Sequence, residues 1–132
     1  MLTKIAHIGV AVSNLQEALA FYKAVGIEPS HIEDVPSQKV KVAFITIGDV
    51  HIELLEPSSP ESPIAGFLDK RGQGMHHIAY EVRDIHTVLK TLKDKGIKLI
   101  NETPVEGAHE MMVAFVHPKS ASGVLTELCQ HK

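Results

Sequence analysis

The sequence predicts an α+β domain built from two βαβββ modules that are related by internal duplication. We expect the modules to form a cleft-shaped mixed β-sheet with helices on the outside. Three observations predict this fold. The similar segments HIGVAVSNL and HIAYEVRDI begin seventy residues apart, at His7 and His77. Behind them, AVGIE and DKGIK recur at the same offset. Later, VHIELLE and VLTELCQ align Glu53 with Glu127 at an offset of seventy-four.

Each copy is predicted to contain a strand, a helix and three further strands. β-rich apolar segments predict the strands, and apolar residues at helical spacing predict the helices. Ser13 and Asn14 both offer N-cap oxygens for the first helix, Asp84 is the predicted N-cap of the second, and glycines 26 and 96 follow the last helical turns. The predicted order is strand 5–12, a helix from 15 to glycine 26, and strands 28–35, 40–47 and 50–56. In the second copy it is strand 75–82, helix 85–95, and strands near 98–100, 111–117 and 123–129.

The copies are separated by the proline- and serine-rich segment PSSPESP, behind which residues 64–70 predict a short helix. A chain of 132 residues has the length of one ordinary domain. We therefore predict a single domain over residues 1–132. Its first module lies at about 1–57, its connector at 58–74 and its second module at about 75–132.

The composition excludes several classes of protein. The chain is 44% hydrophobic and 22% charged, which is enough apolar material for a core. A net charge of −3 gives no basic footprint for nucleic acid or for an anionic membrane. A single cysteine excludes an intramolecular disulfide framework and suits a reducing compartment. The N-terminal segment lacks a signal-peptide apolar region, and no apolar run reaches about 18 residues. We expect a soluble, cytoplasmic protein.

The duplication also predicts a metal site. If the two copies pack around a pseudo-twofold axis, their equivalent faces line one concavity that holds two imidazoles and two carboxylates. The predicted metal ligands are His7, Glu53, His77 and Glu127. This donor set balances a divalent ion and suits Zn, Mn, Co, Ni or Fe. A six-coordinate ion would keep two positions for a substrate with two oxygens, which favours proton transfer beside a carbonyl group.

The other histidines and the cysteine are predicted to lie outside the metal site. His76 should point to the strand face opposite to that of His77, whereas His51 should share a face with Glu53. Cys129 is predicted to be a packed or interface thiol rather than a nucleophile. The predicted surface histidines are His31, His86 and His131, and the histidines on loops or strand ends that allow substrate contact are His109 and His117.

Four segments carry a resemblance to a known family: HIGVAV, HIELLEP, SPIAGFLDKRGQGMHHIAYEV and EGAHEMMVAFVHPKSASGVLTELCQ. With them, the chain resembles the vicinal oxygen chelate superfamily, which comprises glyoxalases, bleomycin resistance proteins and dioxygenases. Within it, the chain is most similar to the methylmalonyl-CoA epimerase family. The likeness spans almost the whole chain, and the SPIAGFL and GMHHIA motifs are specific to that family.

The resemblance implies an isomerase that interconverts the C2 epimers of methylmalonyl-CoA by proton transfer through a metal-bound enolate. It implies that His7, Glu53, His77 and Glu127 bind a divalent metal ion. It also gives Glu127 a catalytic role from the metal shell. The implied partners are an acyl-CoA substrate and a second copy of the chain in a homodimer.

The chain departs from the family at the second catalytic base. The family commonly has a glutamate after the proline that ends the second strand, and Ser37 stands there in this sequence. A serine hydroxyl is a poor base at neutral pH, and the nearby carboxylates are those of Glu33 and Asp34. The candidate cations for the CoA phosphates are Lys39, Lys41, Arg71 and Lys119.

Two other functions are compatible with the same residues. The first is a glyoxalase I-like lactoylglutathione lyase, or a related isomerase of thiol hemithioacetals, which would use the metal cage for a different proton shuttle. The second is a non-enzymatic member of the superfamily that binds a small molecule. Ring-cleaving dioxygenases use two histidines and one carboxylate, so the fourth oxygen ligand argues against them.

Overall fold

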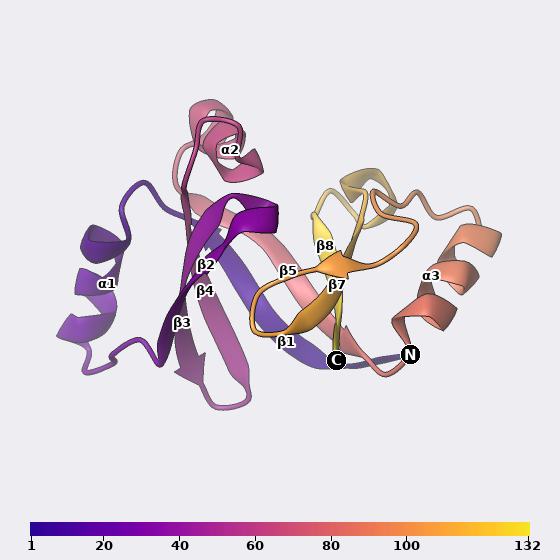
Figure 1. The fold of residues 1–132 in the computed structure, drawn as a ribbon, viewed down its shortest axis with the longest axis horizontal. Helices are drawn as coiled ribbons and strands as arrows, with labels where there is room; N and C mark the ends of the chain where they lie inside the picture. The colour runs from indigo at the N-terminus through magenta and orange to yellow at the C-terminus, as the bar shows by residue number, and fades with distance from the viewer. The chain divides into compact units, whose positions relative to one another are not determined.

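The structure is a computed structural model that describes residues 1–132 (Figure 1). The chain divides into two compact units. The N-terminal unit is His7–His76, and the C-terminal unit combines Met1–Ala6 with His77–Lys132. The first six residues therefore belong to the unit formed by the second copy, and the proline-rich connector belongs to the N-terminal unit. Both ends of the chain lie in the C-terminal unit.

The N-terminal unit has the strand order β2-β3-β4-β1. Strands β1 and β4 are parallel, whereas β2 and β3, and β3 and β4, are antiparallel neighbours. Its elements are β1 (Leu2–Ala11, of which residues 7–11 lie in this unit), α1 (Leu15–Ala24), β2 (His31–Val35), the 3-10 turn η1 (Pro36–Gln38), β3 (Val40–Ile47), β4 (Val50–Pro57) and α2 (Pro63–Arg71).

Helix α1 covers one face of this sheet. Leu15 and Leu19 are buried on the helix, and they form a cluster with Ala43 and Ile45 of β3 and Leu54 of β4. Since side chains alternate along a strand, residues 42, 44, 53 and 55 lie on the opposite face. That opposite face is the one that carries His7 and Glu53.

The C-terminal unit repeats this arrangement, with the strand order β1-β5-β8-β7-β6. The first part of β1 lies beside β5, where the Thr3 hydroxyl donates a hydrogen bond to the Glu81 carbonyl (3.0 Å). Strands β5 and β8 are parallel, as β1 and β4 are in the other unit. The elements are β5 (Gly74–Val82), α3 (Ile85–Asp94), β6 (Val105–Glu106), β7 (Met111–Val116), the 3-10 turn η2 (Pro118–Ser120) and β8 (Thr126–His131).

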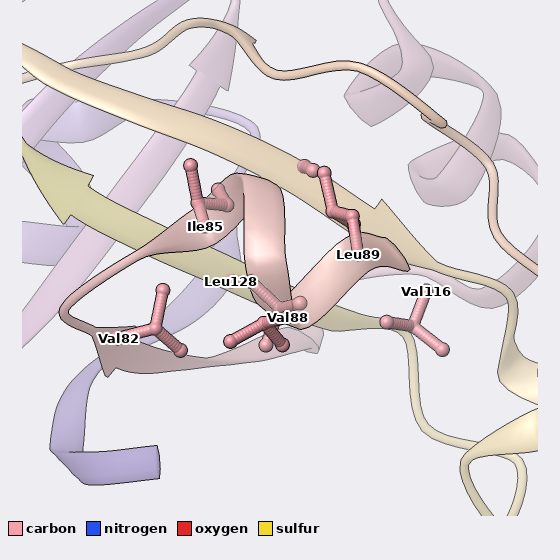
Figure 2. Packing of buried hydrophobic residues seen from close by; sticks show 7 residues of the cluster. Val82, Ile85, Val88, Leu89, Val116 and Leu128 are labelled. Atoms are coloured by element: carbon pink, nitrogen blue, oxygen red, sulfur yellow. The ribbon is translucent and has the colours of Figure 1, made fainter. Parts of the chain in front are cut away.

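Helix α3 packs on one face of the C-terminal sheet. Figure 2 shows its apolar residues Ile85, Val88 and Leu89 in a cluster with Val116 of β7 and Leu128 of β8. Ile85 is fully buried and Leu89 is 3% exposed, so the helix is fixed by its apolar stripe. The opposite face of this sheet carries His77 and Glu127.

Both α1 and α3 begin with the same kind of capping hydrogen bond. The Asn14 side chain accepts from the Glu17 N–H (2.9 Å), and the Asp84 carboxylate accepts from the Thr87 N–H (3.2 Å). These are N-caps at the predicted positions.

A second bond ties each helix to the strand that carries the glutamate of its copy. The Leu15 N–H donates to Glu56 at the end of β4 (2.8 Å), and the Ile85 N–H donates to Gln130 near the end of β8 (2.7 Å). We call these two bonds the helix anchors.

Most predicted elements are confirmed. The α+β class and the βαβββ order of each copy hold, as do both N-caps, the helix-ending glycines at positive φ, strand β3 and the short helix α2. The prediction of a strand at 98–100 was wrong: Leu99 makes an isolated bridge to Val116, and the regular strands beside β7 are β8 on one side and β6 on the other. The Phe115 N–H donates to the side-chain oxygen of Asn101 (2.8 Å), where a regular strand would offer a backbone carbonyl. The last strand begins at Thr126, three residues later than predicted.

None of the helices is both long enough and apolar enough to cross a membrane.

Candidate functional site

The N-terminal unit brings together the histidine and the glutamate of the first copy. The parallel register of β1 and β4 pairs Gly9 with Glu53, which puts the Glu53 side chain on the face that carries His7. The Nδ1 atom of His7 lies 2.9 Å from Oε2 of Glu53, and both side chains are 9% exposed.

The C-terminal unit repeats this geometry with the second pair. Ala79 pairs with Glu127 in the register of β5 and β8, in the same way as Gly9 pairs with Glu53. The Nε2 atom of His77 lies 3.2 Å from Oε1 of Glu127, with side chains 5% and 8% exposed. The two units therefore present equivalent His–Glu pairs on equivalent strands.

Burial separates these four residues from the other residues of their kinds. Of the nine histidines in the chain, only His7 and His77 are buried, and Glu53 and Glu127 are the only buried carboxylates. Removing a carboxylate from water is costly unless a partner compensates for the lost hydration. A polar pair kept buried in both copies is typical of a functional site rather than of a core.

A phenylalanine lies across from each glutamate. Phe44 of β3 pairs with Glu53, and Phe115 of β7 pairs with Glu127. The Phe115 ring meets the His77 ring edge to face, with centroids 5.8 Å apart. Neither phenylalanine was predicted to be part of the site, although the two recur at an offset of seventy-one, close to that of the histidines. Each gives its His–Glu pair an apolar neighbour that excludes water.

The donor chemistry suits a divalent metal. Each pair offers one imidazole nitrogen and one carboxylate oxygen, which are the donors preferred by metals of intermediate softness. The two carboxylates carry the two negative charges that a divalent cation would balance. In the N-terminal unit the nitrogen that faces the carboxylate is Nδ1, and in the C-terminal unit it is Nε2.

The remaining histidines have other neighbours. His76 packs edge to face on Phe67 of α2, with centroids 5.0 Å apart, whereas the neighbouring His77 is buried beside Glu127. His51 shares a hydrogen bond with Thr46 (3.1 Å), and His117 caps the turn η2. The exposed histidines are His31, His86, His109 and His131, of which His31 contacts Glu33 and His131 contacts Glu81.

The residues considered for the second base and for CoA lie near or at the surface. Ser37 is exposed on the turn η1, outside the strands. The Arg71 guanidinium lies over the Phe67 ring, 5.7 Å from its centroid. The other candidate cations are exposed as well: Lys39, Lys41 and Lys119. Their contact with CoA stays a prediction.

Comparisons with known proteins place this chain in a family. The sequence matches the Glyoxalase/Bleomycin resistance protein/Dioxygenase superfamily over residues 6–115. It is 43% identical to the mitochondrial methylmalonyl-CoA epimerase of Bos taurus over 131 residues, which cover 98% of this chain and 75% of the bovine protein. The chain belongs to the methylmalonyl-CoA epimerase family of that superfamily.

Two further relatives agree with this assignment. The ethylmalonyl-CoA/methylmalonyl-CoA epimerase of Cereibacter sphaeroides is 42% identical, and the match covers 98% of this chain and 99% of that protein. A solved structure of a Streptomyces coelicolor methylmalonyl-CoA epimerase variant with 2-nitronate-propionyl-CoA matches with a TM-score of 0.94 at 36% identity. That match covers 99% of this chain and 96% of the Streptomyces chain. The predicted family and fold are thus confirmed, and the epimerase interpretation is favoured over the lactoylglutathione lyase one.

Proposed function

We propose that this protein is a metal-dependent epimerase that interconverts the two C2 epimers of methylmalonyl-CoA by proton transfer. The observation that carries the proposal is the buried His–Glu pair that each unit presents on equivalent strands. Membership of the epimerase family and the acyl-CoA bound to a relative support the substrate class.

We infer that His7, His77 and Glu127, each of which offers one ligand atom, bind one divalent ion together with Glu53. A divalent ion held there would supply Lewis-acid stabilisation of the negative charge that develops on the thioester oxygen. Co, Mn, Zn, Ni and Fe all suit two imidazoles and two carboxylates.

The protein itself must move the C2 proton. We propose that Glu127 exchanges a proton with one face of C2, where its carboxylate is the base for one epimer and its acid form is the proton donor for the other. Burial of Glu127 beside the Phe115 ring keeps bulk water away from the carboxylate. The enolate is therefore reprotonated by a positioned group rather than by solvent.

Solvent exchange tests this function directly. Each epimer of methylmalonyl-CoA is incubated with the protein in D2O, and C2 deuterium content and epimer ratio are followed by mass spectrometry and chiral analysis. We expect exchange and epimerisation in the wild type, and loss of epimerisation by at least about 100-fold in Glu127→Gln. Glu28→Gln, which changes an exposed glutamate, is the matched control and should retain activity. Turnover of a methylglyoxal hemithioacetal without any C2 exchange would instead support the lyase.

We also propose that the protein acts as a homodimer in the cytoplasm. Strand β2 is an edge of the N-terminal sheet, and edges of this kind are commonly covered by a partner. Light scattering coupled to size exclusion gives the mass of the particle in solution, and a mass equal to one chain would contradict the dimer.

A further inference from the structure

The strand β2 carries a carboxylate on the ligand face of the N-terminal unit. We propose that Glu33, held by His31, is the second base of the epimerase, the group that exchanges the C2 proton on the face opposite to Glu127. This inference rests on the proposed epimerase function. It replaces Ser37, which lies exposed on a turn and has no basic group to offer.

The strand register places Glu33 on the face that carries Glu53. His31 pairs with Phe44 across β2 and β3, and Phe44 pairs with Glu53 across β3 and β4. The His31 and Phe44 rings are stacked with centroids 5.6 Å apart, so the His31 side chain lies on that face. Glu33 is two residues further along the strand and therefore points the same way.

Direct contacts hold the Glu33 carboxylate in place. Its Oε1 atom lies 3.1 Å from Nε2 of His31, and its side chain is 29% exposed. Its cross-strand neighbour is Val42, which is 1% exposed and pairs in turn with the buried Leu55. The Glu33 carboxylate therefore lies beside the buried side chains of Val42 and Leu55 and is only partly exposed to solvent.

The neighbouring Asp34 is excluded by the same register. Residue 34 alternates with residue 33, so its side chain lies on the other face, where α1 packs against Ala43. Its cross-strand partner is Lys41, and both residues are exposed. Of the two carboxylates near the end of β2, only Glu33 faces the site.

The position of Glu33 suits a base that works on a bound acyl group. Strand β2 lies two strand spacings, about 10 Å, from the β4 strand that carries Glu53, so Glu33 stands on the same face as the proposed ligand but apart from it. In the C-terminal unit, the residue at the position equivalent to Glu33 is Val105 on β6, which pairs with Val113 of β7. Glu33 therefore has no counterpart in the second copy, as expected of a group that is needed once.

The proton transfers balance with these two residues. When Glu33 acts as base, the C2–H bond breaks, the proton goes to its carboxylate, and the bonding electrons form the enolate. Glu127 in its acid form then donates its proton to the other face of C2, and a new C–H bond forms. Glu33 ends protonated and Glu127 ionised, which is the starting state for the reverse reaction.

A two-base mechanism makes a specific prediction for Glu33→Gln. Epimerisation should fall by at least about 100-fold, because one face of C2 has lost its base. The epimer whose C2 proton faces Glu127 should still exchange that proton for deuterium at a rate close to that of the wild type. Asp34→Asn and Ser37→Ala are the controls and should epimerise normally. Metal content, melting temperature and affinity for an unreactive CoA thioester should be unchanged in Glu33→Gln.

The outcomes separate the inference from the function that it rests on. Epimerisation within about threefold of the wild type in Glu33→Gln would overturn the inference and leave the epimerase function intact. Loss of exchange from both epimers in a folded, metal-loaded Glu33→Gln protein would also overturn it, since Glu33 would then be a positioning residue. Absence of exchange with the wild type would remove the epimerase function and the inference together.

Discussion

The helix anchors can be tested because the two copies use different residues for the same bond. Glu56 accepts a hydrogen bond from the Leu15 N–H at the start of α1, and Gln130 accepts one from the Ile85 N–H at the start of α3. If the acceptor oxygen is what matters, Glu56→Gln should be tolerated, because the second copy already uses glutamine. Glu56→Ala removes the acceptor and leaves a partly buried N–H unsatisfied.

The structure sets the size of the effect. The Leu15–Glu56 bond is 2.8 Å long and part-buried. Losing such a bond costs about 1 kcal/mol, and about 2 kcal/mol if the N–H finds no water. For 132 residues the entropy of unfolding is about 0.28 kcal/mol/K, so Glu56→Ala should lower the melting temperature by about 4–7 °C. Glu56→Gln should lower it by at most about 2 °C, as should Gln130→Glu.

Calorimetry of the four variants at one pH and one metal concentration gives the comparison, with Gln130→Ala as the equivalent deletion in the C-terminal unit. If Glu56→Gln loses as much stability as Glu56→Ala, the anchor acts through the charge of Glu56 near the helix N-terminus and our explanation is wrong. If neither substitution changes the melting temperature, α1 is held by its apolar stripe alone.

Three further predictions concern the core, the pH dependence and the metal. Leu19→Ala should cost about 2–5 kcal/mol in urea unfolding because Leu19 is 1% exposed, whereas Phe21→Ala, at a position 66% exposed, should change stability by less than about 0.5 kcal/mol. Thr87 donates side-chain and backbone hydrogen bonds that hold the pKa of Asp84 below its ordinary value of 3.8. The Asp84 contribution is therefore present above about pH 4 and is lost as the pH falls through the lowered pKa. Thr87→Ala should lower the melting temperature at pH 6 by more than at pH 3, and an equal loss at both would contradict this. Removing the metal with a chelator should lower the melting temperature of the wild type by about 10 °C when the metal is at 100 times its Kd. The chelator should have no effect on His7→Ala; an equal fall there would contradict the proposed ligands.

The sequence predicted the elements whose signals are local. Asn14 and Asp84 are caps because each side chain bonds to an N–H only three residues ahead, and β3 was placed correctly because its apolar run has clear ends. The strand expected at 98–100 failed because pairing is not local. Its neighbour Asn101 offers a side-chain oxygen to the Phe115 N–H, and no pattern within 98–100 reveals that.

The candidate site was predictable only in part, because some of its residues are marked by the repeat and others by strand pairing alone. The repeat aligned His7 with His77 and Glu53 with Glu127, and the structure pairs the histidine and the glutamate of each copy at 2.9 and 3.2 Å. Phe44, Phe115 and the choice of Glu33 over Asp34 depend on the strand register, which a single sequence does not give. That Glu33 and Glu53 share a face follows only from the pairing of β2 with β3 and of β3 with β4.

The distribution of these features over the two units has a consequence for the origin of the chain. One copy supplies only one imidazole and one carboxylate to the proposed metal site, so an ancestor with a single copy would have needed a second molecule to assemble the four proposed ligands. Fusion of two copies replaces that encounter by an intramolecular one, at an effective concentration that no longer depends on expression level. Fusion also frees the two halves to diverge. Glutamate at 56 stands against glutamine at 130, and glutamate at 33 stands against valine at 105, so a once symmetric assembly can treat the two faces of one carbon atom differently.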